Sequence, residues 1–342
     1  YVSFAGFIWR IIRRNGDGSV RMIYSGKSTS DTGDATMIGT SQFNNKYWDP
    51  TYVGYKYNED FSLHENNETT GYVWFTNTTK YNFGTGYTFD ESTKKFTLTG
   101  DIKQLTWNDN HDEIVNNQLY SCLETGCNVV YKVTGYSDAN TMKVQPITYS
   151  SNSLLSAQTN TTDSSIKTKL DSWYKSNLVS YTSYLADETF CSDRSITSGS
   201  GYLTAQTTIY GAYTRLQDRK TPSLKCGQEN DKFKVSSTSA KLDYPIGLIL
   251  ADEAALAGGN SSKSNSNYYL YNGKYYWTFS PSYFYSWFSI ALVWHVLSSG
   301  SLDPGYYVAV YGGVRPVISL KQNITISKGD GSALNPFAVA VD

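Results

Sequence analysis

Residues 275–314 form a segment in which one formal charge, Asp303, stands among closely spaced aromatic side chains. Apolar runs at 268–280, 290–300 and 306–320 predict β-strands, because turn residues interrupt them and no helical period fits them. A segment so poor in charge is either buried in a β-rich core or displayed as a contact surface. The whole chain follows the same trend, since only 17% of its 342 residues are charged and 15% are aromatic. That composition excludes intrinsic disorder.

The net charge of the chain is −1, from 29 basic and 30 acidic residues. A protein that holds nucleic acid by bulk electrostatics carries a clear excess of basic residues, so we expect no nucleic-acid partner. A membrane helix needs about 18–20 consecutive apolar residues. The best candidate, residues 4–12, is too short and contains Arg10. We therefore expect no membrane span in this chain.

The chain begins with two alternating apolar runs, within residues 4–24, that flank the turn sequence Asn15-Gly16-Asp17-Gly18. Asn-Gly and Asp-Gly readily supply positive φ angles, so the pattern predicts a β-hairpin. Short alternating runs broken by turn residues fill 68–149 and predict a β module. A linker rich in Ser, Thr and Asn follows at about 150–162.

Two segments predict helices. After the N-cap sequence ending in Ser164-Ser165, apolar residues share one helical face; they are Ile166, Leu170, Trp173, Tyr174 and Leu178. A second helix is expected from about Ala251, ended by Gly258-Gly259.

The cysteines are Cys122, Cys127, Cys191 and Cys226. Their spacings match no zinc-binding pattern, and the histidines lie far from them in sequence. An even number of cysteines in a chain of low charge favours disulfides and an oxidising compartment over free cytosolic thiols. We expect the pairs Cys122–Cys127 and Cys191–Cys226, and an extracellular or cell-surface location.

Catalytic signatures are missing from the sequence: there is no HExxH, GxSxG, Walker loop or GxGxxG. Asp252 and Glu253 open the second predicted helix, where carboxylates stabilise the helix dipole, so we interpret them as capping residues. The acidic run 108–113 is interpreted as a solvated turn, with a cation site as the alternative. We expect no enzyme activity, no catalytic residue, no cofactor and no resident metal.

The run YFYSWFSI at 283–290 follows Pro281 and has no clean period. Aromatic residues mixed with serine are typical of binding surfaces such as antibody paratopes, whereas the alternative is a buried loop. We expect Tyr285, Phe288 and Ile290 to be exposed. The expected core residues are Trp277, Trp294 and Val317.

Three pieces occur in order: YPIGLILADEAALAGG (244–259), YYWTFSPS with VWHV (275–282 and 293–296) and GGVRPVIS (312–319). This order resembles C-type-lectin-like domains of the formylglycine-generating-enzyme type. It is also similar to the variable proteins of diversity-generating retroelements and to pilin-like surface proteins of gut Firmicutes. The resemblance covers about 1–57 and 163–342.

The resemblance implies an α+β, C-type-lectin-like fold formed by 1–57 and 163–342, with 58–162 as an inserted all-β module. The enzymes use cysteines in the C-terminal part of the fold. None follows Cys226 here, so their activity is not implied. In retroelement variable proteins, the diversified positions arise by mutation of adenines, commonly in Asn codons. Such codons cannot become codons for Lys, Glu, Gln or Met, and residues 275–314 contain none of these four residue types. Arg315 is expected to be a buried hydrogen-bond hub.

These observations predict an extracellular adhesion or recognition protein that displays an aromatic-rich, diversifiable surface to a protein or glycan on another cell, phage or host. One alternative is a pilin-like or surface-layer subunit that forms homo-oligomers through the same surface. The other is a calcium-dependent glycan lectin. The predicted ligand-binding residues are Tyr283, Tyr285, Ser286, Phe288, Ser289, Ile290, Leu292, His295, Leu297, Tyr306 and Tyr307.

Overall fold

A computed structural model describes most of the chain. The described residues are 1–58, 64–65, 87–90, 95–98, 119–121, 129–138, 141–148, 154–202, 206–261 and 263–341. They divide into two compact units. The first comprises 1–58, 158–201 and 207–342, and the second comprises 59–157 and 202–206. The division into a lectin-like domain and an inserted module at 58–162 stays a prediction.

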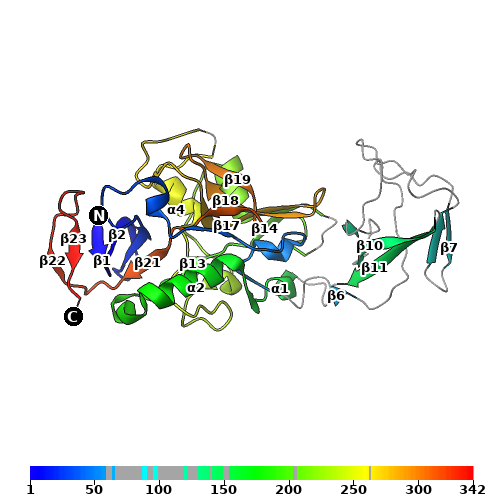
Figure 1. Ribbon diagram of the computed structural model, residues 1–342, viewed down its shortest axis with the longest axis horizontal. Helices are drawn as coiled ribbons and strands as arrows, with labels where there is room; N and C mark the ends of the chain where they lie inside the picture. The colour runs from blue at the N-terminus through cyan, green and yellow to red at the C-terminus, as the bar shows by residue number, and fades with distance from the viewer. Residues whose placement is uncertain are drawn as a thin grey trace. The chain divides into compact units, whose positions relative to one another are not determined.

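Within the described residues of the first unit, six strands form a sheet that brings the two ends of the chain together (Figure 1). The order is β21 (Val317–Leu320), β3 (Val20–Tyr24), β2 (Phe7–Arg14), β1 (Val2–Phe4), β23 (Phe337–Val339) and β22 (Ile326–Lys328). β1 and β23 pair in parallel, whereas β2 and β3 pair antiparallel. β22 lies at one edge of this sheet.

The predicted N-terminal hairpin is confirmed by the pairing of β2 with β3. The backbone NH of Asn15 donates to the carbonyl of Ser19 at 2.8 Å, and Gly18 has a φ of 89°. Gly18 therefore supplies the left-handed conformation that the turn requires.

The second sheet of this unit is built around the long hairpin of β17 and β18 (Figure 1). Its main order is β14 (Ile196–Ser198), β15 (Thr208–Tyr210), β17 (Tyr276–Tyr285), β18 (Ile290–Val296) and β19 (Leu302–Tyr307). β20 (Tyr311–Gly313) pairs with both β17 and β4 (Thr40–Gln42). Two small ladders join β5 (Lys56–Tyr57) to β12 (Thr162–Asp163) and β13 (Phe190–Cys191) to β16 (Lys232–Phe233).

The helices of the first unit are short. They are α2 (Ser165–Asn177), α3 (Gly211–Tyr213), α4 (Ala251–Leu256), the π-turn Thr214–Asp218 and the 3₁₀ turns Gly33–Thr36, Pro50–Val53, Val179–Tyr184 and Glu229–Asp231. Both predicted helices are confirmed. The hydroxyl of Ser164 accepts from the NH of Lys167 at 3.4 Å and caps α2, and Gly258, with a φ of 114°, follows α4.

The described elements of the second unit are mostly strands. They are β6 (His64–Glu65), β7 (Tyr87–Asp90), β8 (Lys95–Leu98), β9 (Leu119–Ser121), β10 (Val129–Asp138), β11 (Thr141–Thr148) and the short helix α1 (Leu154–Ala157). β6, β11, β10 and β9 form one sheet, and β7 pairs with β8. Cys122, Cys127 and the acidic run 108–113 lie outside the described residues, so their predicted roles stay predictions.

The predicted fold class, α+β and C-type-lectin-like, is wrong. Strands account for 31% of the chain and helices for 19%, and the strands form several mixed sheets. The resemblance rests on short motifs around a helix-bearing segment, yet the helix in that segment, α4, has only six residues. The chain is mostly β because its apolar residues occur in short runs suited to sheets, while a sustained helical period occurs only near α2.

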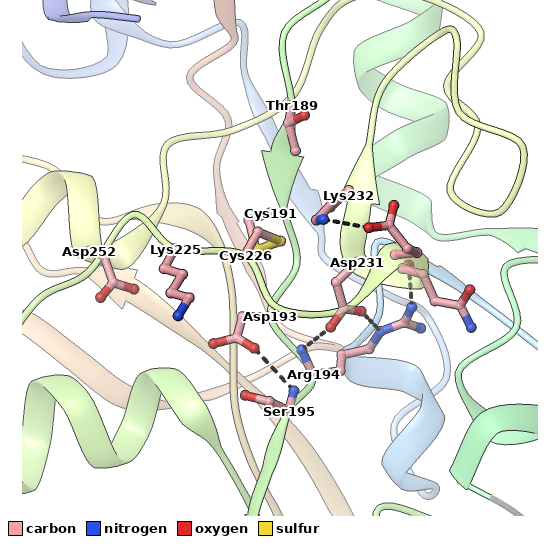
Figure 2. The surroundings of a disulfide bond; sticks show 12 residues. Thr189, Cys191, Asp193, Arg194, Ser195, Lys225, Cys226, Asp231, Lys232 and Asp252 are labelled. Carbon is pink, nitrogen blue, oxygen red and sulfur yellow. Dashed lines mark hydrogen bonds and ion pairs between the residues drawn. A yellow bond between two sulfur atoms is a disulfide. The ribbon is translucent and has the colours of Figure 1, made fainter. Parts of the chain in front are cut away.

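Buried ion pairs hold the irregular segments of the first unit against its sheets. Figure 2 shows Arg194 with Asp231, whose carboxylate accepts from both the side-chain Nε and the backbone NH of Arg194 at 2.7 Å. Burial raises the pKa of Asp231, and the arginine opposes this rise. Arg315 is a buried hydrogen-bond hub, as predicted, because its guanidinium donates to the carbonyls of Tyr24 and Leu270.

The Cys191–Cys226 disulfide is confirmed and lies beside this ion pair (Figure 2). It spans 35 residues of mostly irregular chain and connects β13 to the segment that precedes β16. In the described part of the chain, no helix is both long and apolar enough to cross a membrane.

We predict that a Cys191→Ser/Cys226→Ser double variant loses about 4 kcal/mol of unfolding free energy, the loop-entropy value for a loop of this length. Chemical denaturation of wild type and variant measures the difference. A loss below about 0.5 kcal/mol would contradict the assigned stabilising role.

Candidate functional site

The hairpin of β17 and β18 separates its side chains onto two faces. Pro281 lies at an irregularity in the ladder, where a missing backbone NH is tolerated. Beyond it, Phe284 pairs with Ala291, and both are fully buried on the core face. Tyr283 pairs with Leu292 and Tyr285 with Ile290, so these residues lie on the opposite face.

Aromatic side chains gather on that opposite face and at the tip of the hairpin. Phe288 is 60% exposed and its ring lies 5.4 Å from that of Tyr285, which is 37% exposed. Tyr285 in turn lies 6.3 Å from Tyr283. Tyr307 of β19 pairs with Leu292, which places it on the same face as Tyr283. We name these four residues, together with Tyr47, the aromatic patch.

Tyr47 reaches the patch from a distant part of the sequence. Its backbone carbonyl accepts a hydrogen bond of 2.7 Å from the NH of Ala291 in β18. Burial and the neighbouring Tyr47 hydroxyl both raise the pKa of Tyr307. The side chain of Tyr47 is itself exposed.

The structure brings most of the predicted binding residues together, although not all of them face solvent. Tyr285, Phe288 and Tyr307 are exposed. The half-buried members are Tyr283, Ser286, Ser289, Leu297 and Tyr306. Ser286 and Ser289 form the turn between β17 and β18, where the NH of Ser289 donates to the carbonyl of Ser286 at 3.2 Å.

Three predicted binding residues are buried, and the prediction that Ile290 is exposed is therefore wrong. Ile290 is 5% exposed and pairs with Tyr285. Leu292 lies on the central strand β18 with a tyrosine on each side, and these rings cover it. His295 stacks on Tyr306, with ring centroids 4.1 Å apart. Ile290 and Leu292 therefore lie next to patch tyrosines on the neighbouring strands, whereas His295 packs against Tyr306 outside the patch.

The predicted core residues behave as expected, since Trp277, Trp294 and Val317 are fully buried. Trp277 packs against Phe43 and Tyr306. Trp294 contacts Tyr213 of α3. Tyr283 also contacts the ring of Tyr213, at a centroid distance of 5.5 Å, so α3 fixes one end of the patch.

Asp303 carries the negative charge of this region. Its Oδ1 accepts from the NH of Gly305 at 2.6 Å. A Cβ atom at Gly305 would lie 3.2 Å from Asp303 Oδ1 and 3.8 Å from the hydroxyl of Tyr283. Gly305 therefore lies beside both the carboxylate and this hydroxyl, where a side chain would be crowded. We name Tyr283, Asp303 and Gly305 the Asp303 site.

Sequence reasoning missed Tyr47 and the role of Asp303. No local signal identifies Tyr47, because it joins the patch through a backbone pairing between distant segments. Asp303 did have a signal, since it is the one formal charge between 275 and 314.

One acidic cluster has the donor types that a metal ion needs. Asp163, Asp171 and Asp243 place carboxylate oxygens within 4.8 Å of one another. The ammonium of Lys167 lies among them, 2.9 Å from Asp163 and 2.5 Å from each of the other two. Burial acts to lower the pKa of Lys167, but hydrogen bonds to the three carboxylates outweigh it and raise the pKa. The cluster is a structural ion network that anchors α2.

We predict that substitutions of exposed aromatic residues lower the unfolding free energy much less than substitutions of buried ones. The unfolding free energy of a Tyr285→Ser/Phe288→Ser variant should lie within about 1 kcal/mol of the wild-type value, as is usual for two surface substitutions. Trp294→Ala should lose about 3–5 kcal/mol, the cost of removing a buried aromatic ring. Denaturant unfolding measures both. A loss above about 2 kcal/mol in the first variant would show that the patch belongs to the core.

We predict that His295 makes the fold acid-sensitive. Burial lowers its pKa from 6.5 to about 4, although the carboxylate and carbonyl of Asp303 act in the opposite direction. Between these pH values the unfolded chain binds the proton more tightly than the folded chain. The stability contribution is therefore present above pH 6.5 and lost as the pH falls toward 4.

The expected loss for wild type is about 2–3 kcal/mol between pH 7 and 4.5 from this group. Between pH 7 and 4.5 the unfolding free energy of His295→Gln should fall by about 2–3 kcal/mol less than that of wild type, because the variant lacks this titrating group. Denaturant unfolding of both proteins at the two pH values measures the difference. An equal loss in wild type and variant would contradict the assignment to His295.

Comparison with known proteins gives no match to a protein family, to a curated protein or to a solved structure. The resemblance to retroelement variable proteins stays a prediction. The support for a function therefore comes from the residues of the aromatic patch and the geometry of the Asp303 site.

Proposed function

We propose that this chain is an extracellular ligand-binding protein that recognises its partner through the aromatic patch. One observation carries the proposal: Tyr285, Phe288, Tyr307 and Tyr47 remain exposed beside a core that buries other aromatic residues completely. Exposed aromatic clusters on rigid elements are typical of binding surfaces, because they supply contact area with little loss of side-chain entropy.

The scaffold supports this role by holding the patch in place. β17 and β18 pair along their length, and Tyr307 follows from the neighbouring strand β19. Tyr213 and the buried side chains of Ile290 and Leu292 support the rings from below and from one side. A surface fixed before binding loses less entropy when the ligand arrives.

The disulfide supports the proposed location. Cys191 and Cys226 are bonded in the described structure, and such bonds persist mainly in secreted and cell-surface proteins.

A binding panel tests the proposal. Immobilised cell-surface proteins and glycans are probed with wild type and with Tyr285→Ser/Phe288→Ser. The control is Val179→Ser/Leu334→Ser, which changes two exposed apolar residues elsewhere in the first unit. We expect a panel member that wild type and control bind equally and that the patch variant binds at least tenfold more weakly, as for the loss of an interface hot spot.

Two outcomes would contradict the proposal. One is equal binding by wild type and the patch variant. The other is no binding by wild type together with self-association that the patch substitutions abolish in analytical ultracentrifugation. That second result would identify the patch as a subunit interface.

A further inference from the structure

The Asp303 site combines a carboxylate with aromatic faces, and no cation of the described chain neutralises it. Among the described residues, the one basic group within 4.0 Å of Asp303 is the His295 ring, at 3.9 Å from Oδ1. Burial lowers the pKa of His295 to about 4, so this ring is neutral at physiological pH. The carboxylate thus remains an uncompensated negative charge.

The carboxylate also keeps hydrogen-bonding capacity for a ligand. Oδ1 is occupied by the NH of Gly305. The side chain is 40% exposed, and in the described part of the chain Oδ2 has no hydrogen-bond donor. A carboxylate accepts several hydrogen bonds, so a donor that approaches over Gly305 finds a free oxygen.

One tyrosine hydroxyl, that of Tyr283, lies beside the same glycine as this carboxylate. The hydroxyl of Tyr283 and Oδ1 of Asp303 lie 3.8 Å and 3.2 Å from the position that a Cβ atom of Gly305 would take. The ring of Tyr283 contacts those of Tyr213 and Tyr285 at centroid distances of 5.5 Å and 6.3 Å, so Asp303 borders the aromatic patch. Gly305 contributes no side chain between the Tyr283 hydroxyl and the Asp303 carboxylate, and a Cβ atom there would crowd Asp303 Oδ1 at 3.2 Å. Aromatic faces next to a carboxylate attract cations through both the ring quadrupole and the charge.

We infer that the Asp303 site receives an arginine side chain of a protein partner. A guanidinium group donates hydrogen bonds to a carboxylate while its planar face stacks on a tyrosine ring, and it is always charged. This inference rests on the proposed function and specifies the chemistry of the ligand.

Charge complementarity favours a basic protein over a glycan. The hydroxyl groups of a neutral glycan can donate hydrogen bonds to Asp303 but leave its charge in place, whereas a cation also neutralises it and forms the stronger, charge-assisted hydrogen bond. An anionic glycan would be repelled by the same charge. A basic protein segment neutralises the carboxylate and covers the exposed rings of the aromatic patch in one contact.

A pair of peptides tests the inference by ligand-observed NMR. One is acetyl-Gly-Arg-Gly-amide, and the other carries citrulline in place of arginine, which keeps the shape and removes the charge. We expect wild type to bind the arginine peptide about tenfold more tightly than the citrulline peptide, the ratio for about 1.4 kcal/mol.

Two variants locate the effect. Asp303→Asn retains an acceptor for the Gly305 NH but removes the charge. Gly305→Ala places a Cβ atom 3.2 Å from Asp303 Oδ1 and so crowds the carboxylate, without a positive-φ conflict. Each should weaken binding of the arginine peptide about tenfold. The matched control is Asp330→Asn, because Asp330 also accepts from the NH two residues on, that of Ser332 at 2.9 Å, in the β22–β23 turn of the other sheet. This control should bind like wild type.

Equal affinity for the two peptides, unchanged binding by Asp303→Asn, or no binding of the arginine peptide at millimolar concentration would overturn the inference. So would a glycan from the panel whose binding depends on Tyr285 and Phe288 but not on Asp303. That last result would leave the proposed binding function intact, so the two failures are distinguishable.

Discussion

The buried carboxylate of Glu253 connects the two sheets of the first unit. Its Oε1 lies 2.7 Å from Arg21 Nε on β3 and 2.9 Å from Arg13 Nε on β2, while Oε2 accepts from the NH of Leu250 at the start of α4. Arg21 and Glu253 are almost fully buried, and unpaired charges in such surroundings are strongly unfavourable. The segment before α4 continues the connection, since the carbonyl of Ile249 accepts from Phe279 on β17. The hairpin that carries the aromatic patch is thus attached to the N-terminal sheet.

This framework explains why the patch side chains are free to remain in water. The core face of the hairpin is filled by residues such as Phe279, Phe284 and Val293, all fully buried. On the opposite face Ile290 and Leu292 are buried, while Tyr285 and Tyr307 beside them are exposed. The buried face of the hairpin therefore contributes most of its packing, and the exposed face is available to contact a ligand. Asp303, on the neighbouring strand β19, adds a charge that we propose a partner neutralises.

Local patterns allowed several elements to be predicted from the sequence. The turn at Gly18 marks the first hairpin, Ser164 marks the start of α2, and the glycine pair after Leu256 marks the end of α4. The Cys191–Cys226 bond and the buried Arg315 were also predicted correctly. The turn and the helix ends depend on residue types within a few positions. The disulfide follows from the even number of cysteines in a chain of low charge, and a buried arginine needs hydrogen-bond partners.

The fold class could not be predicted, because it depends on pairings between distant segments. β1 pairs with β23 and β4 pairs with β20, and no short motif encodes either contact. The burial of Ile290 and Leu292 has the same origin, since it follows from neighbours on adjacent strands. An aperiodic aromatic run indicated a surface correctly, but the cross-strand partners decided which residues face water.

Hydroxyl-radical footprinting of the isolated protein at low concentration tests most directly whether the aromatic patch is displayed. Our account predicts rapid modification of Tyr285 and Phe288 and strong protection of Trp277 and Trp294, because only the first pair contacts solvent. Protection of Tyr285 and Phe288 equal to that of the buried tryptophans, in a sample that is monomeric, would contradict the account.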